Sequence, residues 1–134
     1  MPRESLDTNI LLRLYLKDIP AQFELVKRLV ETPGKKFTIS DTAIIEYIFV
    51  LERHYQFTRD QIAEMLTALM SRSNFLCNRT VFPSALELYQ QNLALSFEDC
   101  YLAETARIQG ATPLWTFDKA LAKKCPAAQV LEDD

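Results

Sequence analysis

The chain has little glycine and little sulfur, and both shortages exclude classes of function. Its 134 residues contain two glycines, Gly34 and Gly110, so the glycine-rich loops that bind nucleotide phosphates are excluded. The cysteines are three in number, Cys77, Cys100 and Cys125, and there is a single histidine. Their wide spacing gives no Cys-x-x-Cys pair and no zinc motif. A cysteine nucleophile would also need a nearby base, and nothing in the sequence indicates that the single histidine serves as one. We therefore interpret the three cysteines as incidental thiols in a reducing compartment.

Long apolar runs and a positive net charge are also lacking. The longest apolar runs, such as 43–45 and 47–51, stop far short of the roughly 18 residues that a membrane span needs. The N-terminus has no basic stretch followed by an apolar core, so we expect a cytoplasmic protein without membrane contact. The net charge is -3, so any contact with nucleic acid requires a local basic patch. Apolar residues make up 49%, which suits one domain over residues 1–134.

Short strand-like runs alternate with helical patterns along the chain. Runs typical of strands lie at residues 5–7, 37–39, 75–77, 114–117 and 130–131, with helical patterns between them. This alternation predicts an α/β fold: three α/β/α layers around a central, mainly parallel sheet of four or five strands. In such sheets the functional crevice lies at the carboxyl ends of the strands.

Capping signals mark where several helices should begin and end. Asp18, shortly before a proline, is predicted to cap the second helix, and Ser40 or Asp41 suits the start of the third. Thr58 and Gln61 have the spacing of a capping box. Gly110 is placed to end the helix that begins near residue 97. These signals fix the expected helix boundaries.

Four acidic residues lie where such a sheet would bring them together. Asp7 lies at the end of the first strand and Asp118 follows the strand at 114–117, while Asp99 opens a helix. Glu46 interrupts an apolar helical run, so its carboxylate is expected beside or within the apolar packing. Each acid alone has an ordinary alternative: three suit helix caps or turns, and Glu46 suits a helix-edge position paired with Arg53 or a lysine. Taken together, they fit one crevice.

A cluster of carboxylates repels itself, and a divalent cation relieves the repulsion. Oxygen donors without histidine or cysteine favour a hard ion, Mg²⁺ or Mn²⁺, completed by water and phosphate oxygens. The pattern therefore predicts metal-assisted phosphodiester hydrolysis. Thr8, Asn9 and Thr116 are candidates to orient the acids or the attacking water.

The acids lie in four short blocks that follow one another along the chain. The blocks read LDTNILLR at 6–13, IEYIFVLERHY at 45–55, FED at 97–99 and TFDK at 116–119. In this order and spacing they resemble the successive motifs of PIN-domain nucleases, most closely those of VapC-type toxins of toxin–antitoxin pairs. The resemblance spans nearly the whole chain.

The resemblance implies an activity, a cofactor and partners. The activity would be Mg²⁺-dependent endoribonuclease cleavage, with Mn²⁺ as a substitute, and its effect as a toxin would be to inhibit translation and growth. The catalytic acids would be Asp7, Glu46, Asp99 and Asp118; of these Asp7, Asp99 and Asp118 would bind the metal, with Thr116 as a supporting hydroxyl. The partners would be an RNA substrate, a small antitoxin protein and a second copy in a homodimer.

Binding of RNA requires cations near the acids, and Arg13 and Lys119 are the predicted contacts. Two positions depart from the family's motifs: Ser96 stands where many relatives have Asp, and Glu98 stands where they have Ala. The alternatives are an RNA-processing nuclease without an antitoxin and an RNA-binding protein without turnover. An Asp-nucleophile phosphatase fits less well, because its motif needs a second Asp at the position of Asn9.

Overall fold

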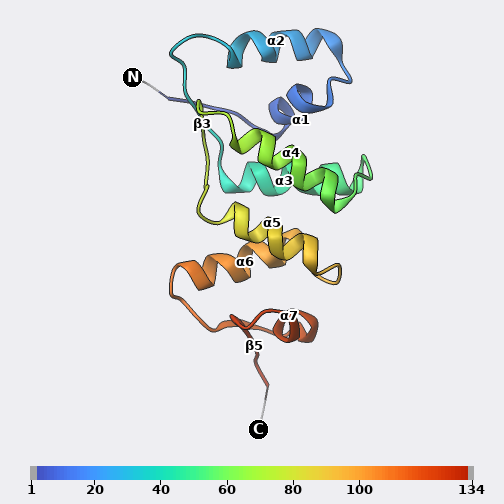
Figure 1. Ribbon diagram of the computed structural model, residues 1–134, viewed down its shortest axis with the longest axis vertical. Coiled ribbons are helices and arrows are strands. Elements are labelled where there is room, and N and C mark those ends of the chain that lie inside the picture. Colours follow the sequence, from blue (N-terminus) through green and yellow to red (C-terminus); the bar gives the residue numbers. More distant parts are fainter. Residues whose placement is uncertain (1–2, 133–134) are drawn as a thin grey trace. The chain divides into compact units, whose positions relative to one another are not determined.

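The computed structural model describes residues 3–132, which form seven α-helices and five β-strands (Figure 1). They fall into two compact units, one ending at Asn78 and one beginning at Arg79. None of the described helices is both long and apolar enough to cross a membrane. The elements of the first unit are β1 (Glu4–Ser5), α1 (Thr8–Leu16), α2 (Pro20–Val30), β2 (Phe37–Thr38), α3 (Asp41–Arg53), α4 (Arg59–Met70) and β3 (Phe75–Leu76). Those of the second unit are α5 (Phe82–Gln91), α6 (Phe97–Ile108), β4 (Leu114–Thr116), α7 (Lys119–Lys124) and β5 (Ala128–Val130).

The strands pair in parallel, as predicted. In the first unit β2 lies between β1 and β3, and Phe37 pairs with Glu4 on one side and with Phe75 on the other. In the second unit β4 pairs with β5. The predicted α/β fold with parallel strands is confirmed, and its five described strands are divided into sheets of three and two. A single domain over residues 1–134 stays a prediction.

Capping side chains begin two helices of the first unit at the predicted positions. The Ser40 hydroxyl accepts a hydrogen bond of 3.1 Å from the backbone N–H of Ala43 and starts α3. At the start of α4 the Thr58 hydroxyl accepts from the backbone N–H of Gln61, whose side chain accepts in return from the backbone N–H of Thr58. The predicted capping box is therefore confirmed.

The predicted cap of α2 by Asp18 is wrong. The helix begins at Pro20 with Ile19 at the N-cap position, and no side chain caps it. The Asp18 carboxylate instead lies 2.7 Å from the Arg13 guanidinium and accepts a hydrogen bond of 3.3 Å from the Tyr55 hydroxyl. Because Tyr55 follows α3, far along the chain, this tertiary contact draws the carboxylate away from the helix start.

The core of the first unit fixes the rotation of α3. The helix packs against α1 and α4, and Figure 1 shows α3 and α4 running beside each other. Its buried side chains recur at the spacing of one helical face. They are Ile44, Tyr47, Ile48 and Leu51. At 100° per residue, position 46 falls on the opposite side of the helix from this face, which turns Glu46 away from the packing.

The core of the second unit is built around aromatic rings of α5 and α6. Phe97 stacks on Phe82 with ring centroids 6.0 Å apart and meets Tyr89 edge-on at 5.4 Å. Offset and edge-on pairs of this kind add to the apolar burial. At the other end of α6, Gly110 adopts φ 67, the left-handed conformation that ends a helix. The predicted stop is confirmed, and the first turn of α6, which carries Asp99, is held by the aromatic core.

Candidate functional site

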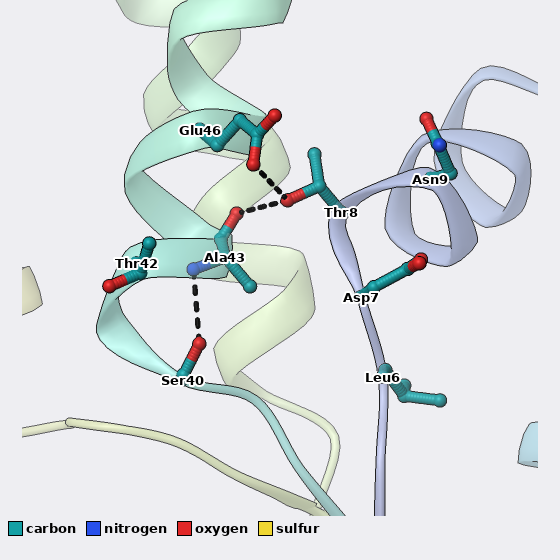
Figure 2. Close-up of a pocket in the computed structure, with 8 residues that line it drawn as sticks. All are labelled: Leu6, Asp7, Thr8, Asn9, Ser40, Thr42, Ala43 and Glu46. Carbon is teal, nitrogen blue, oxygen red and sulfur yellow. Dashed lines mark hydrogen bonds between the residues drawn. The ribbon is translucent and has the colours of Figure 1, made fainter.

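Two of the predicted acids, Asp7 and Glu46, line one open pocket in the first unit (Figure 2). The pocket has a volume of about 360 Å³ and lies between the β1–α1 junction and the first turns of α3. Its walls are formed mainly by polar residues at these two helix starts. They are Leu6, Asp7, Thr8, Asn9, Ser40, Thr42, Ala43 and Glu46. Folding of the first unit therefore places two carboxylates that are far apart in the sequence on the wall of one pocket.

Asp7 has a structural task as well as a place in the pocket. It is the N-cap of α1, and its Oδ1 accepts a hydrogen bond of 3.1 Å from the backbone N–H of Ile10. The alternative interpretation of Asp7 as a helix cap is thus correct. The side chain is nevertheless exposed, and a carboxylate has about four acceptor positions. One bond to Ile10 leaves the carboxylate able to bind a ligand in the pocket.

Thr8 connects the two sides of the pocket. It is the one buried polar residue within 3–132, with 8% of its surface exposed. Its hydroxyl lies 3.0 Å from the backbone oxygen of Ala43 and 3.3 Å from Oε2 of Glu46, both on α3. Figure 2 shows the Thr8 side chain pointing between these two acceptors. The hydroxyl thus anchors α1 to α3 and holds the Glu46 carboxylate.

The expectation that Glu46 lies beside or within the apolar packing is wrong. The residue is exposed, because the buried face of α3 lies on the other side of the helix. Arg53, the suggested partner, instead places its guanidinium 5.3 Å from the ring centre of Phe49. The Glu46 carboxylate faces water and the pocket, where charge is retained at low cost.

Ser40 and Thr42 line the pocket although sequence reasoning did not assign them to the site. The Ser40 hydroxyl is used to cap α3, and Thr42 is exposed in the first turn of the same helix. A signal was present in the sequence: both residues open the helix that carries Glu46. Asn9, which was predicted as a supporting residue, is exposed and lines the pocket beside Asp7.

The donors of the pocket fit a hard divalent cation. Asp7 and Glu46 supply carboxylates, and Asn9 and Thr42 add amide and hydroxyl oxygens. Mg²⁺ is commonly bound through one or two carboxylates, with water and substrate phosphates completing its coordination. Within neither unit, as far as each is described, do three or more acidic, histidine or cysteine side chains form a group that could hold a metal ion. The pair in this pocket therefore accounts for part of the predicted acidic site.

Asp118 and Thr116 lie together at the start of α7 in the second unit. Asp118 is exposed and caps the helix, with its Oδ1 accepting a hydrogen bond of 3.0 Å from the backbone N–H of Leu121. Its own backbone N–H donates to the Thr116 hydroxyl at 2.9 Å. Thr116 thus holds the turn that presents Asp118. Their part in metal binding stays a prediction.

Asp99 lies in the first turn of α6, where its backbone N–H donates to the Ser96 hydroxyl at 3.1 Å. It is half-buried.

Burial raises the pKa of the Cys125 thiol, and the negative charges of Glu104 and Asp99 raise it further. A thiol with a raised pKa is a poor nucleophile and a poor metal ligand at neutral pH. For Cys125 this fits the interpretation of the cysteines as incidental thiols, and none of the three forms a disulfide within residues 3–132.

The two residues predicted to contact RNA phosphates, Arg13 and Lys119, differ in how exposed their charged groups are. Arg13 is held by Asp18 at 2.7 Å and donates a hydrogen bond of 3.4 Å to the Tyr55 hydroxyl, and 14% of its side chain is exposed. Lys119 is exposed at the first position of α7, next to Asp118. Of the two, Lys119 presents its charge to solvent more freely.

Comparison with known proteins gives one family. The model of the PIN domain family matches residues 5–125, which include all four predicted acids. No curated protein matches the chain in sequence.

Proposed function

The chain belongs to the PIN domain family, whose members are in general metal-dependent nucleases, and on this basis we propose that it is a Mg²⁺-dependent endoribonuclease. The observation that carries the proposal is the pocket in which Thr8 holds Glu46 opposite Asp7. The four sequence blocks support the finer proposal that the protein is a VapC-type toxin. Its partners would then be an RNA substrate, an antitoxin protein and a second copy in a homodimer.

Asp7 and Glu46 would hold the divalent cation in the pocket. Asp99 and Asp118 enter the proposed site through the sequence blocks in which they lie. The ion, when bound, would activate a water molecule and offset the negative charge on the scissile phosphate. Mn²⁺ supplies the same octahedral oxygen chemistry and is expected to replace Mg²⁺.

The protein's own residues would orient the reacting groups. Thr8 fixes the Glu46 carboxylate through its hydroxyl, and the first turn of α1 fixes the Asp7 carboxylate. Asn9 lies beside them with a free amide for a phosphate oxygen or a water. Lys119 and Arg13 would contact the phosphates of the RNA backbone. Fixed positions lower the entropic cost of reaching the transition state.

The proposal is tested by incubating the purified full chain with total RNA in Mg²⁺ or Mn²⁺. EDTA and the Asp99→Asn variant serve as parallel controls. Discrete fragments are expected with the metal ions, and none in either control. Cleavage that persists at the same rate in EDTA or in Asp99→Asn would overturn the metal mechanism. The toxin role is tested separately: induced expression should arrest growth, and co-expression of an antitoxin, sought as a small reading frame next to the gene, should restore it.

Removal of the Thr8 hydroxyl is expected to reduce cleavage much more than stability. Thr8→Val keeps the volume of the side chain but releases Glu46, so the rate should fall by about tenfold to a hundredfold, as for loss of an outer-shell partner. The free energy of unfolding should change by no more than about 1 kcal/mol. Single-turnover cleavage and urea denaturation measure the two effects.

Thr8→Ser is the matched control, because it retains the hydroxyl and should retain most of the rate. If Thr8→Val and Thr8→Ser cleave equally fast, the hydroxyl does not position Glu46. If both lose stability but not rate, Thr8 is a packing residue only.

A further inference from the structure

The second unit exposes two aromatic side chains next to Asp118. Trp115 of β4 is 54% exposed, and Phe117, which directly follows the strand, is 79% exposed. Leu131, beyond β5, is 51% exposed. Aromatic rings that remain this exposed together form an apolar patch, and such patches commonly mark interaction sites.

The pairing of β4 with β5 sets these side chains on one face. Trp115 pairs with Gln129, and the backbone N–H of Leu131 donates to the oxygen of Thr116 at 2.9 Å, which extends the pairing beyond the strands. Side chains alternate between faces along a strand. Trp115 and Gln129 therefore share one face, and the exposed Phe117 and Leu131 follow directly after the two strands. We name these four residues the aromatic face.

The aromatic face is held by hydrogen bonds on either side of Phe117. The backbone N–H of Asp118 donates to the Thr116 hydroxyl at 2.9 Å, and the Asp118 carboxylate caps α7. Phe117 lies between these two residues, so its backbone is fixed on both sides. Stacking of a ligand on the Phe117 ring would therefore cost little conformational entropy, because the backbone of Phe117 is already ordered.

Positive charge follows the aromatic face directly. Lys119, Lys123 and Lys124 of α7 are all exposed, and Lys119 and Lys123 are one helical turn apart on the same side. From residue 114 to residue 132 these three lysines are opposed by two acidic residues, Asp118 and Glu132, and Asp133 and Asp134 follow in the sequence. Within α7 itself the charge is wholly positive, because its six residues include three lysines and no acid.

We propose that the aromatic face binds single-stranded RNA, with unpaired bases stacked on Trp115 and Phe117 and the phosphates held by the lysines of α7. Proteins that bind single-stranded nucleic acid combine stacking aromatic side chains with cations along the backbone, and this segment carries both. The inference rests on the proposed function, because it assigns the subsite that delivers RNA to Asp118. Other exposed apolar side chains, such as Phe49 and Leu93, have no comparable group of lysines in the adjacent sequence.

The test uses the chain's single tryptophan, Trp115, as the reporter. The purified full chain is titrated in EDTA, so that no cleavage occurs, with a mixed-sequence single-stranded oligoribonucleotide and with the same strand annealed to its complement. Saturable quenching of the Trp115 fluorescence is expected for the single strand and much weaker quenching for the duplex. Equal quenching and affinity for both would overturn base stacking.

Variants extend the test through the anisotropy of a labelled oligonucleotide. Phe117→Ala and Trp115→Ala are each expected to weaken binding by about tenfold or more, whereas Phe117→Tyr should bind as the parent does. Phe49→Ala is the matched control, since Phe49 is also 54% exposed and lies on α3; it should leave affinity unchanged. Parent-like affinity for the labelled oligonucleotide in both alanine variants overturns the proposal.

The outcomes separate this inference from the proposed function. If the variants lose RNA affinity but the parent never cleaves RNA in Mg²⁺, the aromatic face stands and the nuclease proposal fails. If the parent cleaves RNA and Phe117→Ala cleaves it with unchanged KM, the nuclease proposal stands and the aromatic face fails.

Discussion

The Asp7→Asn variant is expected to lose cleavage by on the order of a thousandfold, because a metal-binding carboxylate supplies several kcal/mol of transition-state stabilisation. Its free energy of unfolding should stay within about 0.5 kcal/mol of the parent's. Asn is as good an N-cap as Asp, so its side-chain oxygen can still accept the hydrogen bond from the backbone N–H of Ile10. Single-turnover cleavage in Mg²⁺ and urea denaturation measure the two quantities.

Asp60→Asn is the matched control for the lost charge. Asp60 is exposed in the first turn of α4 and does not line the pocket, so its substitution should leave the cleavage rate near that of the parent. The assignment of Asp7 is wrong if Asp7→Asn and Asp60→Asn cleave equally well. A strongly destabilised Asp7→Asn that still cleaves would leave Asp7 with its capping role alone.

The Phe37→Ala variant is expected to lose about 3–5 kcal/mol of stability. Phe37 is fully buried in the middle strand of the first sheet, and its ring meets the ring of Phe75 edge-on with centroids 6.3 Å apart. Since β1 and β3 flank it, the neighbouring backbone cannot collapse into the space that the ring leaves. Native domains are stable by about 5–15 kcal/mol in total, so this variant should be partly unfolded under mild conditions.

The midpoint of urea denaturation, followed by far-ultraviolet circular dichroism, measures this loss. Phe49→Ala removes the same side chain from an exposed position on α3 and should change stability by less than about 1 kcal/mol. Phe37→Leu should fall between the two. Equal midpoints for Phe37→Ala and Phe49→Ala would show that the ring of Phe37 is not part of a cooperative core.

Sequence patterns predicted the helix boundaries correctly where a boundary depends only on neighbouring residues. The capping box of Thr58 and Gln61 and the stop at Gly110 depend on a few neighbouring residues, so their positions can be read from the sequence. Asp18 failed as a cap because Arg13 and Tyr55 hold its carboxylate. That contact depends on how α3 and its following turn pack against α1, which no local pattern reports.

The candidate site was predicted in part for the same reason. Asp7 was identifiable because it ends a strand and starts a helix, which is a local property. The exposure of Glu46 was not available from the sequence, because apolar residues flank it at 43–45 and 47–51 and only the packing of α3 selects which of them are buried. The hydrogen bond from Thr8 to Glu46 could not be predicted from the sequence either, because it requires the tertiary contact between α1 and α3.

The pocket lies at the beginnings of two helices, and this placement affects its charge balance. The amino end of a helix carries roughly half a positive elementary charge from its aligned peptide dipoles. The starts of α1 and α3 both contribute residues to the pocket walls. Asp7, as the N-cap of α1, lies within reach of this field, whereas Glu46 lies in the second turn of α3, beyond the first turn to which the effect is confined. The two helix starts therefore contribute positive potential to a pocket whose charged side chains are acidic, and added salt should weaken this contribution.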